Sequence, residues 1–333
     1  MKIFVTGSTG FIGSGLVAKL VSEGHTIHAL YRSESKIPRS LQSNGMWFKG
    51  DITDAESMEK AMAGCEAVFH TAAFAGVWHR DVREIYRLNV DATITVLKIA
   101  ARVGIKRCVV TSSAAVFGPS DGTILSESGN MPGKYFTPYE HSKAVMENEV
   151  KKLTASGQDI VLVNPTRLYG PGPLNDANSV TRLIKMYKEG KWHFLPGNGE
   201  SIGNYVFIDD VVNGHILALQ KGLPGERYIL GGENISYKDL FSLLAELTGQ
   251  HHRLIGFPLP LMLASAGLMT FFASLTGISP MITPGLVRKY NHQWKLTSDK
   301  ARTELGYKPV SVREGLIATL QWLNPEPEAK QVK

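Results

Sequence analysis

The chain has 333 residues, of which 43% are hydrophobic and 20% are charged, a composition that excludes disordered and fibrous proteins and suffices for one large or two moderate domains. It contains two cysteines, Cys65 and Cys108, which excludes a disulfide framework and a cysteine-rich metal site. The net charge of +6 is spread along the chain without an arginine-rich arm, so we expect no nucleic-acid binding.

Short apolar runs alternate with helical segments through the first half of the chain. The runs are rich in β-branched residues and bounded by turns; they include KIFV, TIHALY, AVFH, RCVVT and DIVLVNP. This alternation predicts an α/β fold, a Rossmann-type doubly wound parallel sheet with its ligand crevice at the carboxyl ends of the strands. Because the chain opens directly on a strand, we expect no signal peptide and a cytoplasmic location.

The second half of the chain is less regular and predicts a smaller, α-rich substrate lobe. We expect residues 1–168 to form the dinucleotide-binding domain, with 204–222 returning to it. Residues 169–203 and 223–325 are assigned to the substrate lobe, and 326–333 to a flexible tail rich in polar residues.

A long stretch between Arg253 and Arg288 contains no charged residue and includes LPLMLASAGLMTFFASLTG. Its length would allow a membrane span, but its prolines and its many Ser, Thr and Gly residues argue against one. We expect a buried or partner-facing helix of the substrate lobe that lines or caps an apolar pocket. Contact with a membrane surface is a less favoured alternative.

The sequence TGSTGFIG, residues 6–13, follows the first predicted strand and opens a helix. Glycines at these positions permit a tight turn, close approach of the backbone to a pyrophosphate, and close packing of the helix on the strand, while the helix N-terminus supplies amide donors. The turn therefore predicts dinucleotide binding through Gly7, Thr9, Gly10, Phe11, Ile12 and Gly13.

The end of the second predicted strand indicates which dinucleotide is bound. NAD sites usually place a carboxylate there, but this strand ends in Tyr31-Arg32-Ser33. An arginine can bind a 2′-phosphate bidentately and stack on adenine, so we expect NADP (NADPH) to be favoured over NAD. Further on, Asp51 and Ile52 are expected near the adenine; Asp51 has the alternative role of capping the next helix.

Five further motifs carry a resemblance to a known family. They are HTAA (70–73), NVDAT with Asn89, TSSAAVFG (111–118), YEHSK (139–143) and NPTRLYGPG (164–172). In this order and at these spacings the chain resembles the extended short-chain dehydrogenase/reductases, the NAD-dependent epimerase/dehydratase family. The sequence GERYILGGENIS and the apolar stretch near 260 look most like the dihydroflavonol-reductase and 3β-hydroxysteroid-dehydrogenase-like branch.

The resemblance implies catalytic roles for Ser113, Tyr139 and Lys143. Tyr139 would exchange a proton with the carbonyl oxygen, Ser113 would hydrogen-bond that oxygen, and Lys143 would hold the nicotinamide ribose. We also expect the nearby Lys143 ammonium to favour the phenolate of Tyr139. Asn89 is expected either to organise the elements beneath the site or simply to satisfy the buried backbone. Further cofactor contacts are expected from Ala72, Ala73, Asn89, Pro165 and Thr166, besides Tyr139 and Lys143.

Departures from the family pattern narrow the class of substrate that we expect. Dehydratases carry an Asp-Glu pair after the catalytic Ser/Thr, where this chain has Ala114 and Ala115, which argues against dehydration. Many sugar-nucleotide enzymes carry an arginine for the diphosphate where this chain has Gly203 or Asn204, and its absence counts against UDP- or dTDP-sugars as substrates. We expect a hydrophobic substrate pocket formed by Phe74, Trp78, Tyr169 and the apolar segment around 259–275, with Ser113 also contacting the substrate.

Taken together, these features predict an NADPH-dependent reductase of a hydrophobic ketone or aldehyde, with the proton supplied by Tyr139. An NAD-retaining sugar-nucleotide epimerase, using the same three side chains, is the alternative. A non-catalytic dinucleotide-sensing scaffold is disfavoured because Ser113, Tyr139 and Lys143 are all present. No metal is expected, since His251 and His252 have no third ligand in sight. Homodimers are common in the family.

Overall fold

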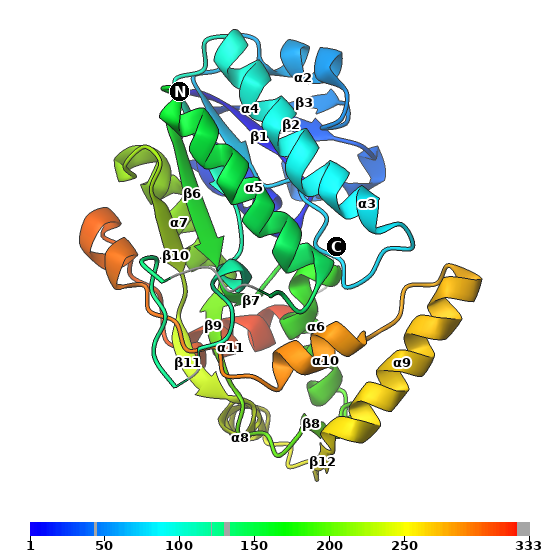
Figure 1. Ribbon diagram of the computed structural model, residues 1–333. Coiled ribbons are helices and arrows are strands. Elements are labelled where there is room, and N and C mark those ends of the chain that lie inside the picture. Colours follow the sequence, from blue (N-terminus) through cyan, green and yellow to red (C-terminus); the bar gives the residue numbers. More distant parts are fainter. Residues whose placement is uncertain (43–44, 121, 130–133, 325–333) are drawn as a thin grey trace, which may run out of the picture.

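The computed structural model describes residues 1–42, 45–120, 122–129 and 134–324, so the expected tail at 326–333 lies outside the described residues. The main element is a seven-stranded parallel sheet with strand order β10-β6-β5-β4-β1-β2-β3 (Figure 1). This architecture confirms the predicted Rossmann-type fold. The strands are β1 (Lys2–Thr6), β2 (Thr26–Tyr31), β3 (Met46–Lys49), β4 (Ala67–His70), β5 (Arg107–Thr111), β6 (Ile160–Pro165) and β10 (Arg227–Leu230).

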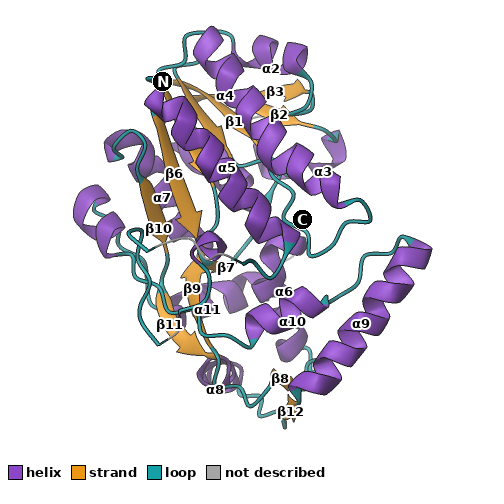
Figure 2. Cartoon of the chain, in the orientation of Figure 1, coloured by secondary structure: helices purple, strands orange, loops and turns teal. Residues whose placement is uncertain are grey.

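Helices cover both faces of this sheet (Figure 2). On one face, α1 (Phe11–Ser22) and α7 (Ile208–Lys221) pack on alternate strand residues such as Ile3 and Val5. On the other, α2 (Ala55–Met62), α4 (Ala92–Arg102) and α5 (Pro138–Ala155) pack on residues such as Phe4. Because successive side chains of a strand point to opposite faces, one buried run of apolar residues supplies both cores. A short helix, α3 (Val82–Tyr86), leads into α4 through a π-helical turn.

A smaller lobe lies at the carboxyl ends of the main strands. Its three-stranded sheet has the order β11-β9-β7, and β8 pairs with β12. An aromatic-rich core joins this sheet to the surrounding helices. The elements are β7 (Arg167–Tyr169), α6 (Ser179–Lys188), β8 (Phe194–Pro196), β9 (Ile202–Phe207), β11 (Glu233–Ser236), α8 (Tyr237–Thr248), β12 (Ile255–Phe257), α10 (Pro284–Tyr290) and α11 (Val312–Leu323).

One boundary of the expected domain division needs correction. The division assigned residues 223–325 to the substrate lobe, but β10 is the edge strand of the main sheet and pairs in parallel with β6. The physical reason is the buried apolar run Tyr228–Leu230, which follows α7 as a strand follows a crossover helix.

Of the two expected placements of the charge-free stretch, a buried helix is wrong, whereas a helix that faces a partner stays a prediction. The helix α9 (Leu259–Thr276) stands away from the body and is connected to it through α10 (Figures 1 and 2). Only three of its residues are buried, Met262, Ala266 and Ala273. Within the described residues, α9 is the one helix that is long and apolar enough to cross a membrane.

Candidate active site

The glycine turn is built as the sequence predicts. Gly7 has a φ of +66°, which favours glycine, and a Cβ there would lie 2.7 Å from the Ala72 nitrogen. A Cβ on Gly13 would lie 2.1 Å from the Gly7 carbonyl oxygen, so glycine is required for α1 to approach this turn. The N-cap of α1, Gly10, has no side-chain cap, and the first turn contains no acidic residue. The turn therefore fits a dinucleotide pyrophosphate, which the uncapped helix N-terminus would attract.

Arg32 and Asp51 lie together at the ends of β2 and β3. The Arg32 guanidinium is 3.7 Å from the Asp51 carboxylate, and its side chain is 72% exposed. Asp51 accepts hydrogen bonds from the amide and hydroxyl of Thr53; these bonds and the charge of Arg32 outweigh the effect of burial and lower its pKa. Arg32 is thus an exposed cation at the end of β2, held by one weak ion pair that an incoming phosphate could replace.

Four more residues of the expected dinucleotide site follow or end the strands β2, β3 and β4. Tyr31 is half-buried with its ring edge-on to Trp47, and Ile52 is buried in the core beneath. Beyond β4, the Ala72 amide donates to the Thr6 hydroxyl, and Ala73 is exposed.

The helix α5 places the catalytic side chains. Pro138 is its first residue, and the Thr137 hydroxyl caps it by accepting from the Glu140 amide. Tyr139 and Lys143 are one turn apart, and the Tyr139 hydroxyl lies close enough to Ser113, which follows β5, for Ser113 to influence its pKa. The structure therefore brings the predicted tyrosine and serine together at the carboxyl end of the sheet.

The electrostatics of this group differ from expectation in one respect. Burial raises the pKa of Tyr139, although the nearby Ser113 acts in the opposite direction. Burial lowers the pKa of Lys143 to about 8, while the nearby Glu147 opposes this effect. The expected lowering of the Tyr139 pKa by Lys143 is wrong for this structure, because the ammonium donates to the Thr111 carbonyl oxygen at 2.9 Å. A protonated Tyr139 at neutral pH suits a proton donor.

Asn89 organises the loop after β4. Its carboxamide oxygen accepts from the Phe74 amide at 2.7 Å, and its nitrogen donates to the Phe74 carbonyl and to the Ser142 hydroxyl. The side chain is fully buried, so it connects the loop to α5, and the expected direct contact of Asn89 with the cofactor is corrected to a supporting role beneath the site. Phe74 and Trp78 lie half-buried on this loop.

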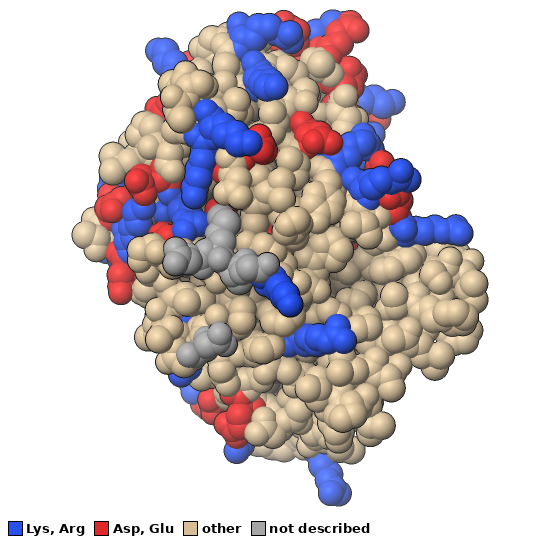
Figure 3. All heavy atoms as spheres, viewed as in Figure 1, with Lys and Arg blue, Asp and Glu red and all other residues tan. Residues whose placement is uncertain are grey.

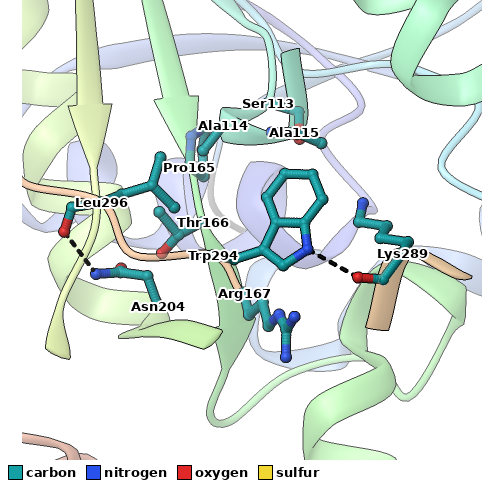
Figure 4. A pocket seen from close by; sticks show the side chains of 10 residues that line it. All are labelled: Ser113, Ala114, Ala115, Pro165, Thr166, Arg167, Asn204, Lys289, Trp294 and Leu296. Carbon is teal, nitrogen blue, oxygen red and sulfur yellow. Dashed lines mark hydrogen bonds between the residues drawn. The ribbon is translucent and has the colours of Figure 1, made fainter. Parts of the chain in front are cut away.

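A small cavity of about 60 Å³ opens beside Ser113 (Figure 4). Pro165 and Thr166, expected to contact the cofactor, line it, as do Ala114 and Ala115. The sequence analysis named Asn204 only as one of two positions that lack a diphosphate-binding arginine, and it did not identify the other lining residues: Arg167, Lys289, Trp294 and Leu296. Arg167 stands in the predicted motif NPTRLYGPG, two residues after the end of the strand β6, and this position was an available signal. Trp294 and Lys289 lie far along the chain and carry no such signal.

Tyr169, expected to contact the substrate, is a core residue. It is 2% exposed, its ring packs near Phe207, and its hydroxyl donates to the Val312 carbonyl oxygen at 3.3 Å. A Cβ on Gly315 would collide with the same hydroxyl, so the ring fills the space between β7 and α11. We therefore remove Tyr169 from the substrate site.

The guanidinium of Arg167 occupies the space beside Gly203. A Cβ on Gly203 would lie 2.4 Å from Nη1 of Arg167, which reaches this place from the neighbouring strand β7. Arg167 thus supplies a cation at the position where the arginine is missing. The absence of an arginine at Gly203 therefore does not count against an anionic substrate.

Comparison with known proteins supports the same assignment. The profile described as the NAD dependent epimerase/dehydratase family matches residues 3–231, which include the glycine turn, Ser113, Tyr139 and Lys143. The chain belongs to this family. It is an enzyme that uses NAD(P), as its fold and the geometry of its glycine turn also indicate.

Three relatives match over nearly the whole chain. A protein of Synechocystis sp., provisionally named dihydroflavonol 4-reductase, is 33% identical over 96% of this chain and 93% of its own. A 2-alkyl-3-oxoalkanoate reductase of Stenotrophomonas maltophilia is 30% identical over 95% and 97%. A decarboxylating sterol-4-alpha-carboxylate 3-dehydrogenase of Mus musculus is 28% identical over 95% and 90%. These relatives confirm the predicted branch of the family.

Solved structures confirm the fold. A UDP-glucose 4-epimerase of Thermotoga maritima, solved with UDP-glucose, has a TM-score of 0.82 and 26% identity, covering 97% of this chain and 99% of its own. Epimerases and reductases thus share this architecture, and the chemistry must be inferred from the residues at the site.

Proposed function

We propose that this protein is an NADPH-dependent reductase of a hydrophobic ketone or aldehyde. The observation that carries the proposal is the proximity of Ser113 and Tyr139 at the carboxyl end of the sheet, with the pKa of Tyr139 raised by burial. Both hydroxyls can hydrogen-bond one carbonyl oxygen, and Tyr139 can donate its proton to that oxygen as it gains charge. NADPH, when bound, supplies the hydride.

The cavity wall supports reduction over dehydration. Ala114 and Ala115 line the cavity where an elimination would need an acid and a base. The relatives named as a 3-oxoalkanoate reductase and a sterol 3-dehydrogenase interconvert ketones and alcohols, and both names describe substrates with large apolar parts. Sugar-nucleotide epimerisation is the second candidate, favoured by the full-length match to the UDP-glucose 4-epimerase structure.

The first test is spectrophotometric. Purified protein with NADPH should oxidise it on addition of one or more members of a panel of apolar ketones and aldehydes. A panel of UDP-sugars should leave the NADPH concentration unchanged. Turnover of a UDP-sugar to its epimer, without any reaction of the carbonyl panel, would instead establish the second candidate.

Replacing Arg32 by alanine should weaken NADPH binding by about tenfold or more, a loss of about 1.4 kcal/mol, with little change for NADH. The reason is that Arg32 is the exposed cation at the end of β2, where a 2′-phosphate can accept its two parallel N–H bonds. Fluorescence titration with both cofactors measures the preference. Lys36→Ala, an exposed cation five residues from the strand end, is the control. A wild-type protein that binds NADH as tightly as NADPH contradicts the expected cofactor.

A further inference from the structure

Arg167 is a cation in the active-site cavity with no carboxylate partner among the residues that the structure describes. Its Nη1 donates to the hydroxyls of Tyr205 and Tyr237 at 3.1 and 2.9 Å. Its guanidinium carbon lies 5.1–5.4 Å from the ring centres of Tyr205, Tyr237 and Tyr290. Nη2 is buried without any hydrogen-bond partner.

Burying the Arg167 guanidinium without an anionic partner is energetically unfavourable unless a ligand interacts with its charge. Removing a guanidinium from water carries a large free-energy penalty, and contact with tyrosine faces repays only part of it. The fold nevertheless makes room for this side chain, since any residue larger than glycine at position 203 would overlap it. An unsatisfied donor of this kind in a cavity is explained by a ligand group that supplies the missing acceptor.

The charged residues around the cavity indicate the net charge of the ligand group that Arg167 would bind. The other cation lining the cavity, Lys289, is neutralised by Glu140, whose carboxylate is 2.9 Å from its ammonium. One positive charge therefore remains, which a carboxylate matches with a planar, bidentate geometry. A diphosphate would bring at least two negative charges to this single free cation.

Arg167 and Ser113 line the same cavity of about 60 Å³, with the Trp294 indole between them in the view of Figure 4. This volume is far below the roughly 300 Å³ of a typical ligand pocket, so it accommodates only the polar end of a substrate. The reacting carbonyl at Ser113 and the group at Arg167 must then be separated by few bonds.

We propose that Arg167 binds a carboxylate of the substrate, which is an oxo acid with its carboxylate one or two carbons from the carbonyl and an apolar tail, or the corresponding hydroxy acid. This inference rests on the proposed reductase function, because it takes Ser113 as the position of the reacting oxygen. It adds a specificity-determining residue that the family motif does not assign.

Binding measured with a matched pair of ligands tests the proposal. Tryptophan fluorescence, reporting through Trp294, should show 3-hydroxydecanoate binding at least about tenfold more tightly than its methyl ester in the presence of NADP. Arg167→Met should remove this preference without changing the affinity for the ester. Arg167→Lys should retain part of it. Arg182→Met, an exposed arginine on α6, should leave it intact.

The outcomes separate this inference from the proposed function. Equal binding and equal oxidation of acid and ester by the wild type would overturn the carboxylate site but leave the oxidoreductase function standing. Arg167-dependent binding of UDP-glucose, without binding of the acid, would show that the cation serves a phosphate. Absence of turnover with any carbonyl or alcohol would overturn the function itself. Thermal melting of each variant checks folding, and Arg167→Lys keeps the test open if Arg167→Met unfolds.

An independent observation concerns the exposed face of α9. Leu261, Leu268, Phe271, Phe272 and Leu275 are each 53–63% exposed and recur at spacings of three, four and seven, so they form one stripe. The opposite face, with Met262 and Ala266, packs with Val287 of α10. The exposed stripe is thus unpartnered while the inner face is satisfied.

The charges around the stripe indicate what covers it. No charged residue occurs from 254 to 287, and in Figure 3 the surface over α9 is free of Lys, Arg, Asp and Glu atoms. Arg253 and Arg288, at the two ends of this stretch, are exposed and make no ion pair within the described part of the chain. A helix that pairs with another helix usually carries flanking charges that set orientation, whereas a membrane-surface helix has a charge-free face and basic residues at its edges.

We propose that α9 inserts its exposed face into the surface of a lipid bilayer that contains anionic lipids. Both ends of α9 return to the same lobe, through β12 and α10, so the helix lies in the interface and does not span the membrane. Lys289, on α10, forms an ion pair with Glu140, which is next to Tyr139 in the chain. This ion pair places α10, and with it the attached α9, next to the active site. Apolar substrates dissolved in a bilayer would then have a short route to the catalytic residues.

Vesicle flotation tests this surface. The wild type should float with vesicles of phosphatidylcholine mixed with phosphatidylglycerol, and more weakly with phosphatidylcholine alone. Leu268→Glu with Phe272→Glu should abolish flotation, whereas Leu223→Glu, a charge at an exposed leucine elsewhere, should not. Arg253→Glu with Arg288→Glu should remove the preference for phosphatidylglycerol.

Two results would overturn the membrane surface. One is a wild-type protein, shown to be folded by circular dichroism, that does not float with either vesicle. The other is a lipid-free dimer, measured by sedimentation, that Leu268→Glu with Phe272→Glu converts to monomers, since a second copy would then cover the stripe.

Discussion

Replacement of Tyr139 by phenylalanine is expected to lower kcat for carbonyl reduction by about 10²- to 10⁴-fold, because the variant loses the proton donor. Ser113 remains as the second hydrogen-bond donor, so the substrate should still bind. Burial raises the pKa of Tyr139, so its phenol is protonated throughout the neutral range, and the wild-type rate of reduction should not increase as the pH falls from 8 to 6 on account of this group.

Steady-state kinetics with the substrate found in the carbonyl panel measures this loss. NADPH binding and the melting temperature should stay close to wild type, since the glycine turn and Lys143 still hold the cofactor and the phenyl ring still fills the same space. Tyr86→Phe is a matched control: its hydroxyl bonds His141 at 2.6 Å on the adjoining helices, outside the cavity, and its loss should change kcat little. A Tyr139→Phe enzyme with near-normal kcat would refute the assigned proton donor.

Gly13→Ala should weaken NADPH binding by about 10- to 100-fold and lower the free energy of unfolding by about 1–3 kcal/mol. The added Cβ would lie 2.1 Å from the Gly7 carbonyl oxygen, so α1 must move away from the turn that it closes. That movement displaces the amides at the helix N-terminus from the pyrophosphate. Urea unfolding and fluorescence titration measure the two effects separately.

Gly267→Ala provides the control for this substitution. Gly267 lies within α9, and a Cβ there meets no atom within 4 Å. Alanine is favoured over glycine inside a helix by about 0.5–1 kcal/mol, so this variant should keep full NADPH affinity and gain slightly in stability. Normal NADPH affinity in Gly13→Ala would mean that the dinucleotide does not rest on this turn.

The dinucleotide half of the molecule could be predicted from sequence because its signals are local. Gly7, with its positive φ, and Gly13, whose Cβ would overlap the Gly7 carbonyl oxygen, must be glycine for reasons of backbone geometry within one turn. The apolar runs of the strands are short and uninterrupted. Tyr139 and Lys143 lie one helical turn apart, and Pro138 marks the start of their helix. In each case the decisive residues are close in the chain, so their spacing in the sequence predicts the local structure.

The substrate side could not be predicted in the same way because its contacts are distant. Trp294 and Lys289 reach the cavity from more than 140 residues beyond Tyr139 in the chain, and Tyr169 is removed from it by packing against α11. For α9 the sequence left burial and partner contact both open, because an apolar sequence does not show what covers it. The pKa of Tyr139 depended on where the Lys143 ammonium points, which only the three-dimensional contact with Thr111 reveals.

The most direct test of the account is the fate of the nicotinamide hydrogen. The protein should be incubated with NADPH carrying deuterium at C4, in separate 4R and 4S forms, and with the carbonyl compound that it turns over. The account predicts that one of the two forms delivers its deuterium to the carbinol carbon of the product, one atom for each NADPH consumed, and that Tyr139→Phe abolishes this transfer. Inversion of a sugar-nucleotide carbon with no net consumption of NADPH and no deuterium in the product would contradict it.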